Sequence, residues 1–191
     1  MSASIAALHQ STEAMYRPRA NRLGLWLFII SESFLFSAAI AARFYLSGVD
    51  RPDELNQPLG LAITSVLLAS GVSAYRAEVA IAHDDRRTYL TSIGITIALG
   101  FAFLGGVSLE WDEALRHFPP STVYGSAFLL IIGLHTFHVV TGLAILGVLA
   151  NLGAKGHFGA EDHWWVEAGV KYWHFVDVAW VFIFPTLYLV S

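Results

Sequence analysis

Residues 124–150 read YGSAFLLIIGLHTFHVVTGLAILGVLA, a run of 27 residues without an aspartate, glutamate, lysine or arginine. A hydrocarbon core about 30 Å thick is crossed by a helix of about 20 apolar residues. This stretch therefore predicts a membrane-spanning helix. Four other stretches meet the same criterion, and the five predicted spans are residues 23–46, 58–80, 89–109, 124–150 and 170–190.

The composition of the chain agrees with a membrane protein. Hydrophobic residues make up 55% of the 191 residues, charged residues only 14%, and the mean hydropathy is +0.57. An average soluble domain carries about 25% charged residues. The net charge of −4 does not suggest nucleic-acid binding. Cysteine is absent, which excludes disulfides, Fe–S clusters and thiolate metal sites. We therefore predict an all-α, polytopic membrane helical bundle with five transmembrane helices.

The basic residues predict the orientation of this bundle. With the N-terminus in the cytoplasm, one side of the membrane receives nearly all of them, as the positive-inside rule requires. They are Arg17, Arg19, Arg22, Arg76, Arg86, Arg87, Lys155 and Lys171, against Arg51 and Arg116 on the other side. The C-terminus is then periplasmic. The polar segment 1–22 has no apolar core with a cleavage site, so we expect a cytoplasmic segment rather than a signal peptide, followed by one membrane domain over 23–191.

Two charged residues lie within the first predicted span. Glu32 is about 14 Å from its start, at about 1.5 Å per residue, and is too short to reach the interface. It is either a proton-relay or lipid-headgroup contact, or a neutral acid that is hydrogen-bonded between helices. Arg43 lies near the outer end, and we expect its side chain to extend outward to the interface.

Histidines occupy the last two spans. His135 and His138 are three residues apart, and His174 and Asp177 repeat that spacing. A shared haem needs two histidines at matching depth on facing helices. The predicted span ends place His138 about 18 Å and His174 about 6 Å from the inner side, which disfavours a shared haem. We expect these groups to form hydrogen bonds between helices, worth on the order of 1 kcal/mol each.

The inner edge of the last span is rich in aromatic and basic residues. Tryptophan and tyrosine are typical of the membrane interface. Basic side chains beside them suit a phospholipid headgroup, although simple anchoring is the alternative. The residues are Trp164, Trp165, Tyr172 and Trp173, with Lys155, His157 and His163.

The segment 163–180, HWWVEAGVKYWHFVDVAW, closely resembles the signature of subunit III of the haem–copper oxidases. Three other segments resemble the same family in the same order. They are FIISESFLF at 28–36, EWDEA at 110–114, and YGS at 124–126 followed by HTFHVVTG at 135–142. The resemblance covers the chain from Leu23 to the C-terminus.

This resemblance implies the short, five-helix bacterial form of the cytochrome c oxidase subunit 3 family, without the first two helices of longer members. Such a subunit is a non-catalytic part of a proton-pumping terminal oxidase of aerobic respiration, in the bacterial inner membrane. It has no catalytic residue, metal or other cofactor of its own, and binds phospholipid. Its partners are subunit I as the main interface, subunit II and a small subunit IV, and the haem and copper lie in partner subunits.

The resemblance also implies roles for single residues. Glu32 matches the embedded carboxylate that supports proton uptake and turnover. Lys155, His157, His163 and Trp164 are the implied lipid-binding residues. Buried polar contacts between helices are implied for Glu110, His135, His138, Glu167, His174 and Asp177.

Three alternatives stay open at this point. The chain could be the corresponding component of a quinol oxidase or a nitric oxide reductase, which the haems and substrate of the purified complex would distinguish. It could be a stand-alone haem-binding membrane protein using His135, His138 and His174, which a Soret band of the isolated chain would reveal. A small transporter with Glu32 and Asp177 as a proton relay would show flux in liposomes, but the chain lacks paired broken helices.

Overall fold

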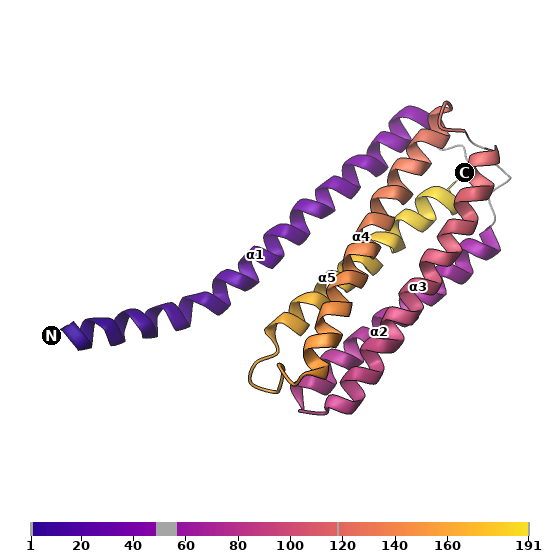
Figure 1. The fold of residues 1–191 in the computed structure, drawn as a ribbon. Coiled ribbons are helices and arrows are strands. Elements are labelled where there is room, and N and C mark those ends of the chain that lie inside the picture. The colour runs from indigo at the N-terminus through magenta and orange to yellow at the C-terminus, as the bar shows by residue number, and fades with distance from the viewer. Residues whose placement is uncertain (1, 49–56, 118, 191) are drawn as a thin grey trace. The chain divides into compact units, whose positions relative to one another are not determined.

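The computed structural model describes residues 2–48, 57–117 and 119–190, with the side chains of all of these except 2–19 and 113. Within these ranges the chain forms five α-helices and one short π-helix (Figure 1). They are α1 (Ser2–Ser47), α2 (Gln57–Ala82), α3 (Arg86–His117), α4 (Val123–Ala154), α5 (Trp164–Phe184) and η1 (Pro185–Leu189). The predicted all-α helical bundle is confirmed.

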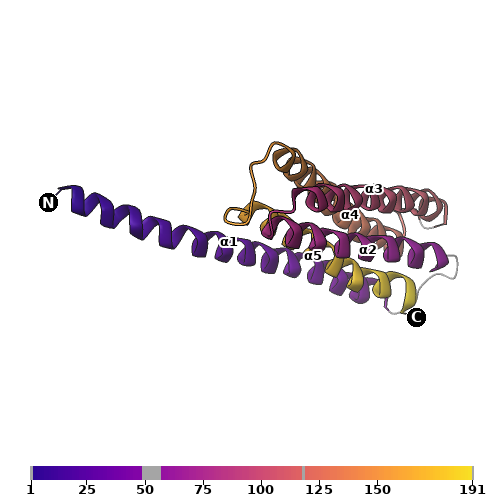
Figure 2. The same ribbon diagram turned by 90° about the horizontal axis from the view of Figure 1, so that it is seen from below.

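The chain divides into two compact units, Met1–Leu35 and Phe36–Ser191. In the first, the described side chains lie on the α1 helix and include exposed Leu23, Trp26 and Phe34. In the second, α2 packs on α3 and α5, and α4 packs on α3 and α5, so that these four helices form a closed ring. Figures 1 and 2 show these four helices side by side along their lengths.

Several helices are longer than the apolar stretches that predicted them. α1 begins at Ser2 rather than at 23, and α5 begins at Trp164 rather than at 170. α3 continues to His117 through residues that we expected to form a loop. This expectation was wrong because Glu110 and Ala114, on the inner face of that segment, are buried against the bundle. The predicted loop 47–57 lies mostly outside the described residues.

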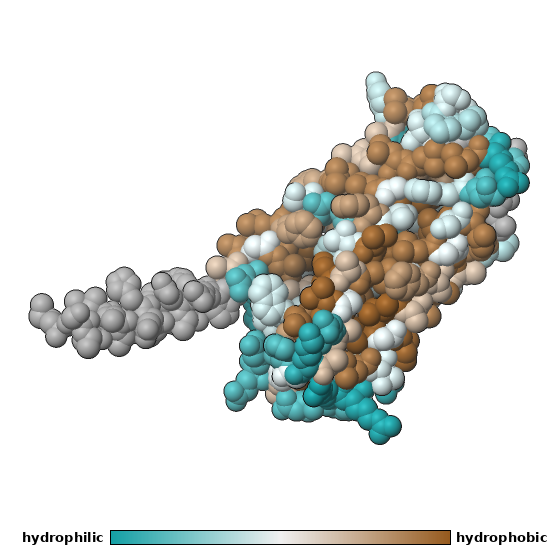
Figure 3. All heavy atoms as spheres, in the orientation of Figure 1, coloured by the Kyte–Doolittle hydropathy of each residue, from teal (hydrophilic) through white to brown (hydrophobic). Residues whose placement is uncertain are grey.

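Four helices in the described ranges are long and apolar enough to cross a membrane: Ala20–Ser47, Gln57–Ala82, Arg86–His117 and Val123–Ala154. α5 falls short of this criterion because Glu167, Lys171 and Asp177 lie within its 21 residues. Hydrophobic residues cover the middle of the Phe36–Ser191 unit on the face seen in Figure 3, and hydrophilic residues gather at its ends.

Small residues bring the helices together. A Cβ on Gly142 would meet the Trp173 ring at 2.7 Å, and one on Gly106 would meet Ile63 at 2.2 Å. Trp173 and Trp180 fill the space inside the ring of helices and are fully buried. Their indole N–H groups donate to Ser70 Oγ at 3.0 Å and to Thr64 Oγ1 at 2.8 Å, so α5 is hydrogen-bonded to α2 through its largest side chains.

Pro185 ends α5 and opens the π-helix η1. A proline has no N–H and its ring clashes with the preceding turn, so a regular α-helix does not continue through it. From Pro185 the chain therefore changes to π-helical geometry. Pro58 lies in the first turn of α2, where its missing N–H is not needed.

Candidate functional site

At one end of the bundle, hydrogen bonds join the α2–α3 turn to the α4–α5 loop. We call this end, where α2 ends at Ala82 and α5 begins at Trp164, the Trp164 end. The backbone N–H of Ala160 donates to Asp84 Oδ1 at 2.7 Å, and the Arg86 guanidinium donates to the carbonyl of Ala154. Asp84 has a φ of 58°, which aspartate tolerates better than most residues. The α2–α3 turn thus holds the α4–α5 loop.

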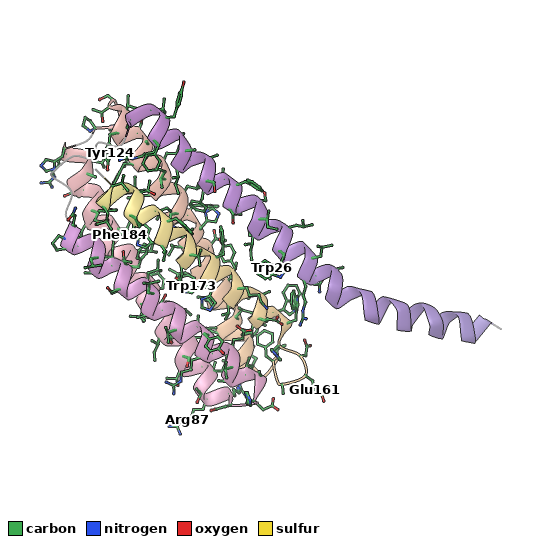
Figure 4. The ribbon with its side chains drawn as sticks, turned by 180° about the vertical axis from the view of Figure 1, so that it is seen from behind. Trp26, Arg87, Tyr124, Glu161, Trp173 and Phe184 are labelled. Carbon is green, nitrogen blue, oxygen red and sulfur yellow. The ribbon has the colours of Figure 1, made fainter. Side chains whose placement is uncertain are left out.

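The predicted lipid-binding residues lie in and beside this loop. Lys155 and His157 are exposed, and His163 and Trp164 are partly buried. His157 Nδ1 lies 3.2 Å from the carbonyl of Leu152, and His163 Nδ1 lies 3.2 Å from that of Gly159. These contacts fix both rings and orient Nδ1 as a donor. The loop therefore offers one lysine and two histidines at the end of the bundle that Arg87 and Glu161 mark in Figure 4.

His135 lies inside the bundle among aromatic rings. It is fully buried, and its ring centroid lies 4.9 Å from that of Trp180 and 5.7 Å from that of Phe103. Among the described residues, neither ring nitrogen has a hydrogen-bond partner. The interhelical hydrogen bond that we expected for His135 is therefore replaced by edge and face contacts with rings of α3 and α5. Its residue type predicted a polar contact, but its neighbours are apolar.

His138 faces α1, on another side of α4. Its ring centroid lies 5.1 Å from that of Phe36, and its Nδ1 lies 2.8 Å from the carbonyl of Leu134 in its own helix. The Tyr172 hydroxyl donates to the His138 carbonyl at 3.2 Å. His138 thus lies where α1, α4 and α5 meet.

His174 and Asp177 face α2 instead. His174 Nδ1 lies 3.6 Å from Asp177 Oδ2, and Asp177 is buried against Gly71. Since α5 starts six residues earlier than predicted, His174 is about 15 Å from its helix start rather than about 6 Å. The His138 ring centroid lies 6.5 Å from that of Tyr172 and 6.2 Å from that of Phe175, which puts His138 level with His174. The predicted depth mismatch was therefore wrong; the two histidines differ instead in the helix that each one faces.

The described residues bring no three potential metal-ligating side chains together. Glu167 and Lys171, one turn before His174, form an ion pair along α5. The three predicted polar contacts of this helix, Glu167, His174 and Asp177, therefore have partners on α5 itself.

A second polar cluster lies at the opposite end, which we call the Tyr188 end. Glu110 is buried, and its Oε2 accepts a hydrogen bond of 2.6 Å from the Tyr188 hydroxyl. The π-helix exposes carbonyls that other helices satisfy: Gln57 donates to that of Tyr188 at 2.9 Å, and Tyr124 to that of Leu187 at 3.0 Å. Tyr124 and Phe184 mark this end in Figure 4. The cluster connects α2, α3 and α4 to the end of the chain.

Arg43 belongs to the same cluster: its side chain extends toward the end of α1 at Ser47, as expected, but it is buried there. Its side chain is fully buried, it donates to the carbonyl of Gly48 at 2.5 Å, and its guanidinium carbon lies 5.5 Å from the ring centroid of Tyr124. An aromatic face stabilises a guanidinium that lies over it. The sequence position of Arg43 does not show that Tyr124 lies beside it.

Glu32 lies on α1 within the Met1–Leu35 unit, twelve residues after Ala20, or about 18 Å along the helix. It is the deepest carboxylate of that candidate span. Its predicted role in proton uptake stays a prediction.

Comparison with known proteins gives a consistent result. A family model described as cytochrome c oxidase subunit III matches residues 4–191. The chain is 38% identical to cytochrome c oxidase subunit 3 of Sus scrofa over 184 residues, which covers 87% of this chain and 68% of the relative. It is 36% identical to that of Gallus gallus over 179 residues, with the same coverage. For Branchiostoma floridae the identity is 36% over 194 aligned positions, covering 95% of this chain and 74% of the relative.

Proposed function

The chain belongs to the cytochrome c oxidase subunit III family, and we propose that it is the accessory subunit III of a proton-pumping haem–copper terminal oxidase. The observation that carries this proposal is the family match, which runs from residue 4 to the end of the chain. In this role the chain is a multi-pass membrane subunit that performs no redox step. Haem and copper belong to the partner subunits, which are subunit I as the main interface, subunit II and a small subunit IV.

We place the chain in a bacterial inner membrane with five spans, a cytoplasmic segment 1–22 and a periplasmic C-terminus. Arg86, Arg87 and Lys155 at the Trp164 end support a cytoplasmic position for that end. α5 is proposed as the fifth span although it is less apolar than the others. Asp177 is buried against α2, and Glu167 pairs with Lys171, so its charges are partly compensated within the bundle.

The loop at the Trp164 end is proposed to bind a phospholipid headgroup through Lys155, His157, His163 and Trp164. Basic side chains at a cytoplasmic interface attract anionic headgroups. Replacing Lys155, His157 and His163 together by glutamine should lower the number of phospholipids that stay with the complex in native mass spectrometry. Arg116→Gln, at the opposite end, is the control and should retain them. Equal lipid retention in both variants would refute this binding site.

Glu32 is proposed to support proton uptake by subunit I. Its depth in α1 makes it costly as a structural residue, which favours a functional role. The variant Glu32→Gln should assemble into the complex with normal initial activity but lose activity faster during sustained turnover. Glu161→Gln, which changes an exposed loop carboxylate, should keep the wild-type lifetime. A wild-type turnover lifetime for Glu32→Gln would count against the proposal.

A further inference from the structure

One surface of the bundle carries ionisable side chains along two helices. We call it the α2–α5 strip, and it consists of Glu78 on α2 with Glu167, Lys171, His174 and Asp177 on α5. Glu78 lies within electrostatic reach of Lys171, Glu167 and His174, so the two helices bring these groups together. The sequence suggested Glu167, His174 and Asp177 as polar contacts but not Glu78, which gave no signal of its own.

The strip reaches about the middle of the membrane. Gly71 contacts Asp177 and lies 11 residues before the end of α2 at Ala82, or about 16 Å along the helix. His174 lies ten residues after the start of α5 at Trp164, or about 15 Å. The two helices give the same depth independently. Half of a hydrocarbon core of about 30 Å is about 15 Å, so the imidazole is near the midplane.

At this depth the strip is not covered by the Phe36–Ser191 unit. The side chain of His174 is 39% exposed and that of Lys171 is 32% exposed. Tyr75, one turn from Gly71, is 60% exposed, and Val178, one turn from His174, is 53% exposed. The surface around the histidine is therefore open and includes side chains of both helices.

Apolar lipid tails do not offer polar partners to the ionisable side chains of this surface. Ionisable residues at membrane depth almost always face protein or a water-filled cavity. Lysine can extend its long side chain to the interface, but an imidazole about 15 Å deep is too short to do so. Beyond its contact with Asp177, the exposed part of His174 therefore requires a polar partner at its own depth.

The charges of the strip indicate the chemistry of that partner. Glu167 and Lys171 neutralise each other as an ion pair. Glu78 and Asp177 remain, with one histidine between them, so the strip has an excess of carboxylates. A complementary surface offers hydrogen-bond donors, at least one of them on a basic side chain.

We infer that the α2–α5 strip is the contact surface for a membrane-embedded helix of a partner subunit, which presents a basic side chain and other hydrogen-bond donors to His174, Asp177 and Glu78. This inference rests on the proposed function, since that function supplies a membrane partner. It adds which face of the chain meets this partner and through which residues.

Photocrosslinking in the intact complex tests the inference. A benzophenone amino acid is placed at Tyr75 or Val178, beside the strip, and at Phe101 of α3 or Phe137 of α4 as exposed controls, 60% and 66% exposed. In native membranes, the two strip positions should yield adducts with a membrane subunit of the oxidase, and the controls should not. Adducts with lipid alone, with residues 20–35 of the same chain, or at equal yield from all four positions would overturn the inference.

Substitutions of His174 give a second measurement. His174→Leu removes the polar group and should lower the amount of partner subunit that co-purifies with the tagged chain several-fold. His174→Gln retains hydrogen-bonding groups and should keep most of it. Wild-type recovery with His174→Leu would overturn the inference. His135→Leu, which changes a buried histidine away from this surface, is the control for folding.

The two proposals fail in different ways. If the tagged wild-type chain purifies without a haem–copper subunit, the proposed function is wrong. If it purifies with that subunit but the strip positions crosslink only to lipid, the proposed function stands and the contact surface is wrong.

Discussion

The hydrogen bond between the Tyr188 hydroxyl and the Glu110 carboxylate joins the end of the chain to α3 inside the bundle. A buried carboxylate that loses a donor retains its desolvation penalty, which costs about 1–3 kcal/mol. Tyr188→Phe should therefore lower the thermal midpoint of the purified complex by several degrees. Tyr45→Phe, at an exposed tyrosine away from the α2–α5 strip, should leave it unchanged. Equal midpoints for the two variants would show that the bond contributes nothing.

Replacing His135 by an apolar residue, in contrast, should not lower the stability of the complex. Because its ring nitrogens have no hydrogen-bond partner among the described residues, an apolar side chain of similar size loses no bond there. His135→Leu should retain wild-type stability in thermal unfolding, or exceed it.

A substitution of similar size close to His135 should instead lower the stability. Thr64→Val removes the acceptor of the Trp180 indole N–H and leaves a buried donor unsatisfied, at a cost of about 1–3 kcal/mol. If His135→Leu were the more destabilising of the two, His135 would have a polar partner that this account lacks.

At the scale of the elements, Gly71 sets how closely α2 approaches α5. A Cβ at this position would lie 2.2 Å from Asp177 Oδ2, a distance that requires a side chain or a helix to move. Gly71→Ala should therefore destabilise the bundle and lower the yield of assembled complex. Gly94 has nothing within 4 Å of the same construction, and Gly94→Ala should be neutral or stabilising by up to about 1 kcal/mol. Equal yields for both variants would contradict close packing here.

The start of α3 depends on Asp85, which lies outside the helices. Its Oδ1 accepts from the Thr88 N–H at 3.0 Å, and the hydrogen bonds with Thr88 hold the pKa of the Asp85 carboxyl below its usual value. The carboxylate therefore stabilises the fold above its unfolded pKa of about 3.9, and this is lost as the pH falls through the lower folded pKa.

Asp85→Asn keeps an oxygen that can cap the helix but does not titrate. The stability advantage of the wild type over this variant, measured by thermal unfolding, should be present near neutral pH and disappear below about pH 4. A constant difference across this range would show that the charge of Asp85 plays no part.

Apolar length predicted the number and order of the helices, but not their ends or their mutual rotation. The burial of Arg43 and the bond between Trp180 and Thr64 depend on how helices that are distant in sequence turn toward each other. The hydropathy of an apolar stretch does not show which face of its helix is buried. The grouping of Lys155, His157, His163 and Trp164 was easier to predict, because these four residues are close in sequence and lie in or beside one loop. Their lipid binding stays a prediction.

At the scale of the whole molecule, helices α2, α3, α4 and α5 pack into a closed ring. The α2–α5 strip is exposed on the surface of this ring at membrane depth. A polar strip exposed at this depth suits a subunit that binds another membrane protein rather than one that acts alone. The partner helix that we propose for the strip agrees with the proposed function, which supplies a partner in the membrane.

Purification of the tagged chain from its native membrane, with mass spectrometry and an absorption spectrum of the intact complex, tests the central claim most directly. We predict equal amounts of this chain and a large haem-containing oxidase subunit, with all of the haem assigned to the partner. A chain that purifies alone, or that carries stoichiometric haem by itself, would contradict the account.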